Sequence, residues 1–272
     1  GRGGWGGGGG GRAGGGGGGG GGGSEKRKQL IIDTCILAGK IMLESGSEVY
    51  RTEDTITRIA ANAGEPESVC YTTATGIFVG FRSSNYTQLE NIPQRSINLE
   101  KVSLVNQLSR EFAQKEITLP ELYQRLTLLE TDTPTFSISL RLLAAGIVSC
   151  TLMYIFGGTW QDFIATFFVG VIGYASYLFT QKLFQVPYLD SFAAAFVIGL
   201  LAYLAVHFHL AVNIDNIIIG AVMPLVPGVA ITNSFRDILA GHLISGTARG
   251  TEAIFIAGSV GLGIALIFKL FM

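Results

Sequence analysis

Histidine and cysteine, which build many catalytic and metal centres, are scarce in this chain. Three of its 272 residues are histidine, and none of them precedes His207. A Ser-His-Asp or Cys-His triad is therefore excluded from the N-terminal region, residues 25–132. The three cysteines, Cys35, Cys70 and Cys150, are widely spaced and form no CxxC pair. Neither a disulfide framework nor a zinc site is predicted, and we expect no enzymatic activity, cofactor or metal.

The chain also lacks a strong charge of either sign. It carries 19 basic and 20 acidic residues, a formal net charge of −1. Without a large basic field, no nucleic-acid partner is expected. Charge is concentrated before Arg141, and the remainder is strongly apolar. This shift predicts a soluble domain over 25–135 followed by a membrane domain over 138–272.

Residues 1–23 are almost entirely glycine, interrupted by two arginines, one tryptophan and one alanine. Glycine-rich runs behave as flexible coil. We expect a disordered tail or tag and leave this stretch out of the fold predictions.

Residues 25–135 have the pattern of a cytoplasmic α+β domain. Apolar residues recur at helical spacing over 30–44 and 48–63, and Ser47 is the expected N-cap of the second helix. The composition of 69–82 predicts one strand, with shorter strands near 86–89 and 94–97. Asn98 should cap a helix to residue 114, and a capping box at 118–121 should open another to about 130. Residues 131–135 are the predicted hinge.

The second predicted helix and the turn before it carry the densest charge of this domain. Such a cluster can be a solvated surface with ion pairs at i, i+4, for example Asp54 with Arg58. It can also be a surface that contacts a ligand or acts as a gate. The cluster comprises Glu44, Glu48, Arg51, Glu53, Asp54 and Arg58.

Five apolar stretches are long enough, or nearly so, to cross the roughly 30 Å hydrocarbon core. They are residues 138–156, 163–179, 189–207, 214–231 and 253–272. The segment 238–248 is predicted to be re-entrant or interfacial, so the expected count of about five spans ranges from four to six. Ala257, Gly261 and Ala265 are spaced by four, which predicts a face for close helix packing. Gly170 and Gly173 are expected to serve similarly.

Basic residues favour one orientation of this polytopic α-helical membrane protein. Lys182, Arg236 and Arg249 lie in the second and fourth turns between stretches, whereas the first and third turns contain neither lysine nor arginine. Basic residues stay on the cytoplasmic side of a membrane. The sequence therefore predicts a multi-pass protein of the inner (plasma) membrane, embedded in the lipid bilayer, with its N-terminal domain in the cytoplasm.

The fourth apolar stretch is interrupted where a continuous helix would be expected. Pro224, Pro227 and Gly228 fall inside it. Hydrocarbon tolerates broken backbone only where it is buried in protein or lines a water-filled cavity. Broken helices of this kind form the substrate sites of secondary transporters. These three residues are therefore predicted to help form a substrate site.

Polar residues follow the break. Asn233, Arg236 and Asp237 stand at i, i+3 and i+4, so a helix places them on one face. The planar guanidinium of Arg236 could hold a substrate carboxylate. Asp237 could be its resting partner or a proton carrier, and Glu252 is a second candidate for proton coupling. The alternative is a salt bridge that anchors helix ends at the cytoplasmic surface.

Four segments of the chain resemble the threonine/serine exporter (ThrE-like) family. They are LAGKIMLESGSEVYRTEDTITRIA (37–60), TTATGIFVGF (72–81), NLEKVSLVNQLSR (98–110) and IIGAVMPLVPGVAITNSFRDILAGHLISGTARGTEA (218–253). The similarity covers nearly all of residues 30–272, and the motifs are long and in order. Members of the family are inner-membrane exporters of small polar metabolites, energised by the membrane potential or the proton gradient.

Full-length members of this family carry two membrane halves, and the chain resembles the amino-terminal half. The resemblance therefore implies a split exporter that works as an oligomer with a second, smaller membrane subunit resembling the other half. One split pair of this kind is associated with succinate export, so the implied substrate is threonine or serine, or a dicarboxylate. A membrane-anchored regulatory or enzymatic domain and a passive channel are the alternatives, although an anchor would not need a broken, polar fourth stretch.

Overall fold

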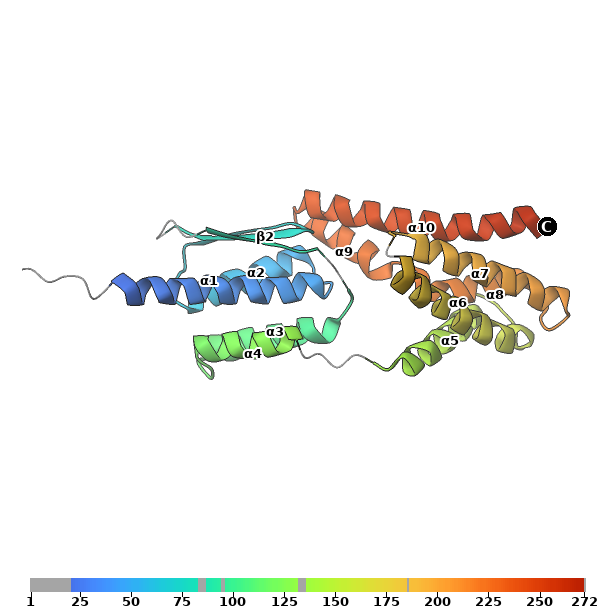
Figure 1. The fold of residues 1–272 in the computed structure, drawn as a ribbon, viewed down its shortest axis with the longest axis horizontal. Coiled ribbons are helices and arrows are strands. Elements are labelled where there is room, and N and C mark those ends of the chain that lie inside the picture. The colour runs from blue at the N-terminus through green and yellow to red at the C-terminus, as the bar shows by residue number, and fades with distance from the viewer. Residues whose placement is uncertain (1–20, 83–86, 94–95, 132–135, 185, 272) are drawn as a thin grey trace, which may run out of the picture.

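The computed structural model describes residues 21–82, 87–93, 96–131, 136–184 and 186–271. They form two units that lie end to end along the long axis of the molecule, an N-terminal unit and a helical unit (Figure 1). Each unit buries its own cluster of apolar side chains. Of the glycine-rich stretch, residues 1–20 lie outside the described residues, and residues 21–23 open the first helix instead of belonging to a tail.

The N-terminal unit has three layers. Its elements are α1 (Gly21–Glu44), α2 (Val49–Asn62), β1 (Ser68–Thr72), β2 (Gly76–Phe81), β3 (Thr87–Asn91), α3 (Leu99–Ala113) and α4 (Leu119–Thr131). The sheet packs on one side of the layer formed by α1 and α2, and α3 and α4 lie on the other side (Figure 1). α1 occupies the centre because its apolar side chains face several neighbours, and Ile32, Cys35 and Met42 are at most 1% exposed.

The sheet is antiparallel with the order β1–β2–β3. Alternate residues of β2, namely Ile77, Val79 and Phe81, are buried, as expected for a strand with one covered face. The prediction of a single strand over 69–82 is wrong. The chain reverses at residues 73–75, where Thr73 N donates to Gly76 O at 2.8 Å, so one β-rich run becomes a hairpin.

The remaining predictions for this unit have mixed outcomes. The predicted strand near 86–89 corresponds to β3, whereas Ser96 and Ile97 are not in a strand and residues 94–95 lie outside the described residues. Asn98 caps α3 as predicted, because its side chain accepts from Lys101 N at 3.1 Å. The predicted hinge falls mostly on residues 132–135, which the structure does not describe.

The helical unit contains four single helices that are long and apolar enough to cross a membrane. A further pair, α8 with η2 followed by α9, is bent by 59° at the predicted break, which gives up to five spans by length and composition. The prediction of a multi-pass helical protein is confirmed at this level. The elements are α5 (Ile138–Ile155), η1 (Trp160–Asp162), α6 (Phe163–Phe184), α7 (Leu189–His207), α8 (Ile214–Val222), η2 (Met223–Leu225), α9 (Gly228–Leu239) and α10 (Leu243–Phe271).

The segment 238–248 forms no separate element, because it is divided between the end of one helix and the start of the next. α9 continues to Leu239, a short turn follows at Gly241 with φ of +91°, and α10 begins at Leu243. The last helix therefore starts ten residues before the predicted boundary at residue 253. The polar residues in this segment suggested a loop, but they lie on helices that face the N-terminal unit.

Glycine allows close contact between several helices of this unit. Gly170 and Gly173 are buried as predicted, and a Cβ at Gly173 would overlap the side chain of Ile198 on α7. The predicted stripe of Ala257, Gly261 and Ala265 instead lies on an exposed face of α10. Gly263 of α10 approaches α7 closely, since a Cβ there would lie 2.6 Å from Phe192 O.

Candidate functional site

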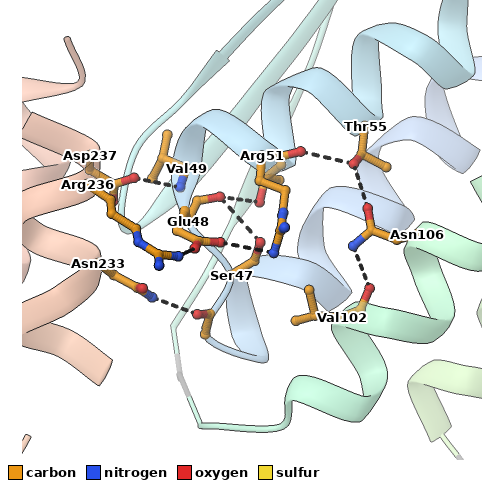
Figure 2. A network of polar contacts seen from close by, with 12 residues as sticks. Ser47, Glu48, Val49, Arg51, Thr55, Val102, Asn106, Asn233, Arg236 and Asp237 are labelled. Atoms are coloured by element: carbon orange, nitrogen blue, oxygen red, sulfur yellow. Dashed lines mark hydrogen bonds and ion pairs between the residues drawn. The ribbon is translucent and has the colours of Figure 1, made fainter. Parts of the chain in front are cut away.

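The turn between α1 and α2 joins the N-terminal unit to the helical unit (Figure 2). α1 ends at Glu44, and two residues later Gly46 has a φ of +85°, in the left-handed region that favours glycine. Ser47 N then donates to Met42 O at 2.9 Å. This geometry turns the chain sharply, and it presents the backbone groups of residues 46–49 to α9 and α10.

Three side chains of the helical unit satisfy these backbone groups. Asn233 Nδ2 donates to Gly46 O at 2.8 Å, and Arg249 Nη2 donates to Ser47 O at 2.7 Å. Asp237 Oδ1 accepts from Val49 N at 2.9 Å. Because Val49 is the first residue of α2, its N–H has no partner within the helix. Asp237 therefore supplies a cap that the local sequence lacks.

The predicted N-cap of α2 is wrong. The cap position is occupied by Glu48, whose side chain makes no capping hydrogen bond, and the Ser47 hydroxyl donates to Glu48 O at 3.3 Å. The helix is capped instead by the carboxylate of Asp237, which lies in the helical unit and follows Ser47 by 190 positions in the sequence. Local sequence patterns carry no information about such a distant partner.

Glu48 connects the two units through an ion pair. Its Oε1 lies 2.5 Å from Arg236 Nη1, and its Oε2 lies 3.5 Å from Arg51 Nη1. Burial acts to raise the pKa of the Glu48 carboxyl. This effect is outweighed by a hydrogen bond from its own backbone N–H, by the hydrogen bond from Arg236 and by the charges of both arginines. The net result is a lowered pKa, so the carboxyl is held in its charged form.

Asp237 and Arg249 form the buried part of the junction. Their side chains are 0% and 5% exposed, and Asp237 Oδ2 lies 3.7 Å from Arg249 Nε. Among the described residues, no donor forms a hydrogen bond with that oxygen. The predicted resting pair of Arg236 with Asp237 is therefore not the one found. Arg236 pairs with Glu48, and Asp237 lies against Arg249 and Val49.

A second carboxylate of α2 faces the turn between α9 and α10. Glu53 Oε1 accepts from Thr72 N at 2.7 Å, and Oε2 lies 3.7 Å from His242 Nε2. Burial raises the pKa of Glu53, opposed by the Thr72 hydrogen bond and the His242 charge. In contrast, Asp54 and Arg58 form an exposed ion pair at 2.6 Å. The predicted charge cluster therefore has two parts. Asp54 and Arg58 form a solvated pair, as predicted, whereas the carboxylates of Glu48 and Glu53 lie at the junction.

A cavity of about 490 Å³ lies beside this junction, between α9, α10 and the ends of α5, α6 and α7 nearest the N-terminal unit. Ligand sites commonly have volumes of this order. Of the residues predicted for the substrate site, Pro224, Pro227 and Asn233 line the cavity, and so does the proton-coupling candidate Glu252. The cavity lining does not include the other three, Gly228, Arg236 and Asp237.

Several polar residues that the sequence did not single out as site residues also line the cavity. They are Arg141 on α5, Tyr174, Tyr177 and Gln181 on α6, and Ser191 on α7. The available signal was weak. Arg141 lies near the start of an apolar helix, and two tyrosines at i, i+3 share a helix face. Without the fold, nothing in the sequence brings these residues next to the break after Met223.

The chemistry of the cavity suits binding better than catalysis. Its walls combine hydroxyl and amide groups with two arginines and one glutamate, around the backbone of residues 224–227. Such walls can bind a small polar or charged solute by hydrogen bonds. Within the described part of the chain, no three His, Cys, Asp or Glu side chains are grouped so that they could hold a metal ion.

Most of the chain is similar in sequence to proteins of one family. The family model of the threonine/serine exporters, ThrE, matches residues 33–271. The chain is also 25% identical over 174 residues to the threonine/serine exporter of Corynebacterium glutamicum, a match that covers 62% of this chain. The match covers 35% of that protein, so the chain spans about a third of its relative's length. No solved structure matches the chain. The chain is therefore a multi-pass membrane protein that belongs to the threonine/serine exporter family.

Proposed function

We propose that the chain is one subunit of an inner-membrane secondary exporter, and that the cavity beside the helix break receives the substrate from the cytoplasm. The observation that carries the proposal is the position of the cavity. It adjoins the backbone break at Pro224 and Pro227, and polar groups from four other helices surround it. Discontinuous helices provide substrate sites of this kind in other secondary transporters.

The N-terminal unit then lies in the cytoplasm and closes the cavity on that side. Leu43 at the end of α1 and Gly46 in the turn after it contribute to the cavity wall, together with Ser96 and Ile97. The same turn is held by Asn233 and by the charged groups of α9 and α10. Export would require these contacts to open, because they lie between the cavity and the N-terminal unit.

Coupling to the proton gradient is proposed to involve Asp237 and Glu252. Glu252 lines the cavity, and Asp237 is buried with one oxygen that forms no hydrogen bond with a described residue. Arg249 connects the two places, because it lines the cavity and lies 3.7 Å from Asp237. A proton on Asp237 would remove its attraction to Arg249 and weaken the junction.

A second, smaller membrane subunit is proposed to complete the exporter. The relative from Corynebacterium glutamicum is much longer than the part matched here. In addition, a Cβ built at Gly261 on α10 meets no atom within 4 Å, and Ala257 and Ala265 on the same face are exposed. Small residues at this spacing allow close approach of another helix.

Efflux from proteoliposomes tests the proposal. Vesicles containing the chain alone, or with the second subunit, are loaded with labelled threonine, serine or succinate under an imposed pH gradient. We expect saturable efflux that needs both subunits. Ala230→Trp should abolish it, because Ala230 lines the cavity. Ile164→Trp is the matched control, because Ile164 is 70% exposed at the other end of α6.

The outcomes separate the alternatives. Efflux that survives Ala230→Trp would show that the substrate does not use this cavity. Efflux that does not saturate would favour a passive channel. If both folded proteins give no efflux of any of the three solutes, a regulatory role for the N-terminal unit would become the better explanation.

A further inference from the structure

We infer that Arg141, near the N-terminal end of α5, binds the carboxylate of the substrate in this cavity. The inference rests on the proposed function, and it assigns a binding role to a residue outside the broken helix. The sequence-based prediction that Arg236 binds the carboxylate stays a prediction. The geometry points to Arg141 for three reasons, which concern its position, its orientation and its partners.

Arg141 is positioned and oriented by α6. Its Nη2 donates to Tyr174 Oη at 3.1 Å, and its Cζ lies 5.9 Å from the centroid of the same ring. The Tyr174 and Tyr177 rings are stacked, with centroids 5.9 Å apart and planes inclined by 15°. A guanidinium has five N–H donors in one plane. The tyrosine uses one of them and holds the plane, which leaves the other donors available for a carboxylate.

The other arginines near the cavity are already engaged. Arg236 pairs with Glu48 and does not contribute to the cavity wall. Arg249 lines the cavity but donates to Ser47 O and lies against Asp237. Arg141 also lines the cavity, and no carboxylate in the described part of the chain forms an ion pair with it. A substrate carboxylate would therefore bind to Arg141 without displacing an internal partner.

The remaining walls favour a substrate of mixed charge. Glu252 of α10 lines the same cavity as Arg141. An amino acid can place its carboxylate on Arg141 and its ammonium group near the Glu252 carboxylate. Threonine and serine, which carry both charges, would fit this arrangement.

Equilibrium binding to the full chain in nanodiscs tests the inference. Labelled threonine is displaced by unlabelled threonine or by threoninol, in which an alcohol replaces the carboxylate. The wild type should bind threonine roughly tenfold to a hundredfold more tightly than threoninol, since a charge-assisted hydrogen bond contributes about 1.5–3 kcal/mol. Arg141→Ala should bind threonine about as weakly as threoninol. Arg58→Ala, in an exposed ion pair of α2, is the control and should behave as wild type.

Two further variants make each result decisive. Tyr174→Phe keeps the ring but removes the hydroxyl that orients Arg141. The preference of this variant for threonine over threoninol should therefore be several-fold smaller than that of the wild type. Unchanged binding of threoninol to Arg141→Ala shows that this variant is folded. If Ala230→Trp abolishes threonine binding but Arg141→Ala keeps the wild-type preference, the inference is wrong and the proposed function stands. If the wild type does not bind threonine, or Ala230→Trp binds it normally, the cavity site and the inference both fail.

Discussion

Removing the Asp237 carboxylate should destabilise the junction between the two units. Asp237 is fully buried, caps α2 through Val49 N and lies against the buried Arg249. Breaking a buried ion pair from one side costs about 3–5 kcal/mol, because the other charge is left without compensation. The lost cap adds an unsatisfied N–H, although the two costs overlap and do not simply add. At roughly 2–4 °C per kcal/mol for a protein of similar size, Asp237→Ala should lower the Tm by about 6–20 °C.

Thermal unfolding of the purified chain in detergent measures this effect. Asp237→Asn keeps an oxygen that can accept from Val49 N, so the Tm of this variant should fall less than the Tm of Asp237→Ala. Adding Arg249→Met to Asp237→Asn should recover part of the loss, because it removes the unpaired charge. Asp54→Ala is the control, since Asp54 is 62% exposed in its pair with Arg58 and should change stability by at most about 1 kcal/mol. An Asp237→Ala variant that unfolds at the same temperature as Asp54→Ala would refute the reasoning.

Three further predictions concern other parts of the chain. Gly263→Ala should lower the Tm because its Cβ would lie 2.6 Å from a carbonyl oxygen of α7, whereas Gly261→Ala meets no atom within 4 Å; equal thermal stability of the two variants would contradict this packing. Burial raises the pKa of Cys70 to about 11 and also raises that of Cys35, so both thiols are protonated at pH 7.5, and the fully buried Cys35 should react with a maleimide only in denaturant. Mass spectrometry of the native protein checks this, and rapid modification of Cys35 would count against it. Burial also raises the pKa of Glu53 above its ordinary value of 4.5, so the native state binds this proton more tightly than the unfolded state, and stability is lost as pH rises through the raised pKa. Relative to Glu53→Gln, the wild-type Tm should therefore fall as pH increases above 4.5, and parallel curves for the two proteins would disprove it.

Apolar composition was enough to predict most of the helices. The stretches that became α5, α6 and α7 were found because a membrane-spanning helix needs many consecutive apolar residues. The break at Pro224 and Pro227 was also predictable, since proline removes a backbone donor wherever it occurs. The start of α10 was missed because polar residues at a helix end resemble a loop when their partners are unknown. The hairpin at residues 73–75 was missed because both strands have the same β-rich composition.

The candidate site was only partly predictable. Pro224, Pro227 and Asn233 were identified from the local pattern, and the structure places them on the cavity wall. The pairing of Glu48 with Arg236 joins residues 188 positions apart, and helical spacing instead suggested the neighbour Asp237 as the partner. In the sequence, Arg141 marks only the point where the charged part of the chain gives way to the apolar part. Its position next to Tyr174 depends on how α5 packs on α6, and one sequence does not contain that information.

The shortness of α8 has a consequence for how the protein enters the membrane during synthesis. α8 has 9 residues, so at 1.5 Å per residue it is about 13 Å long, less than half of the roughly 30 Å hydrocarbon core. It cannot be recognised and released into the lipid as a separate segment. We therefore expect the insertion machinery to hold α8 until α9 has been translated, so that the two enter as one bent unit. In truncated chains released from the ribosome after Val226, this segment should stay accessible from water, whereas in released chains that extend beyond Leu239 it should be stably inserted.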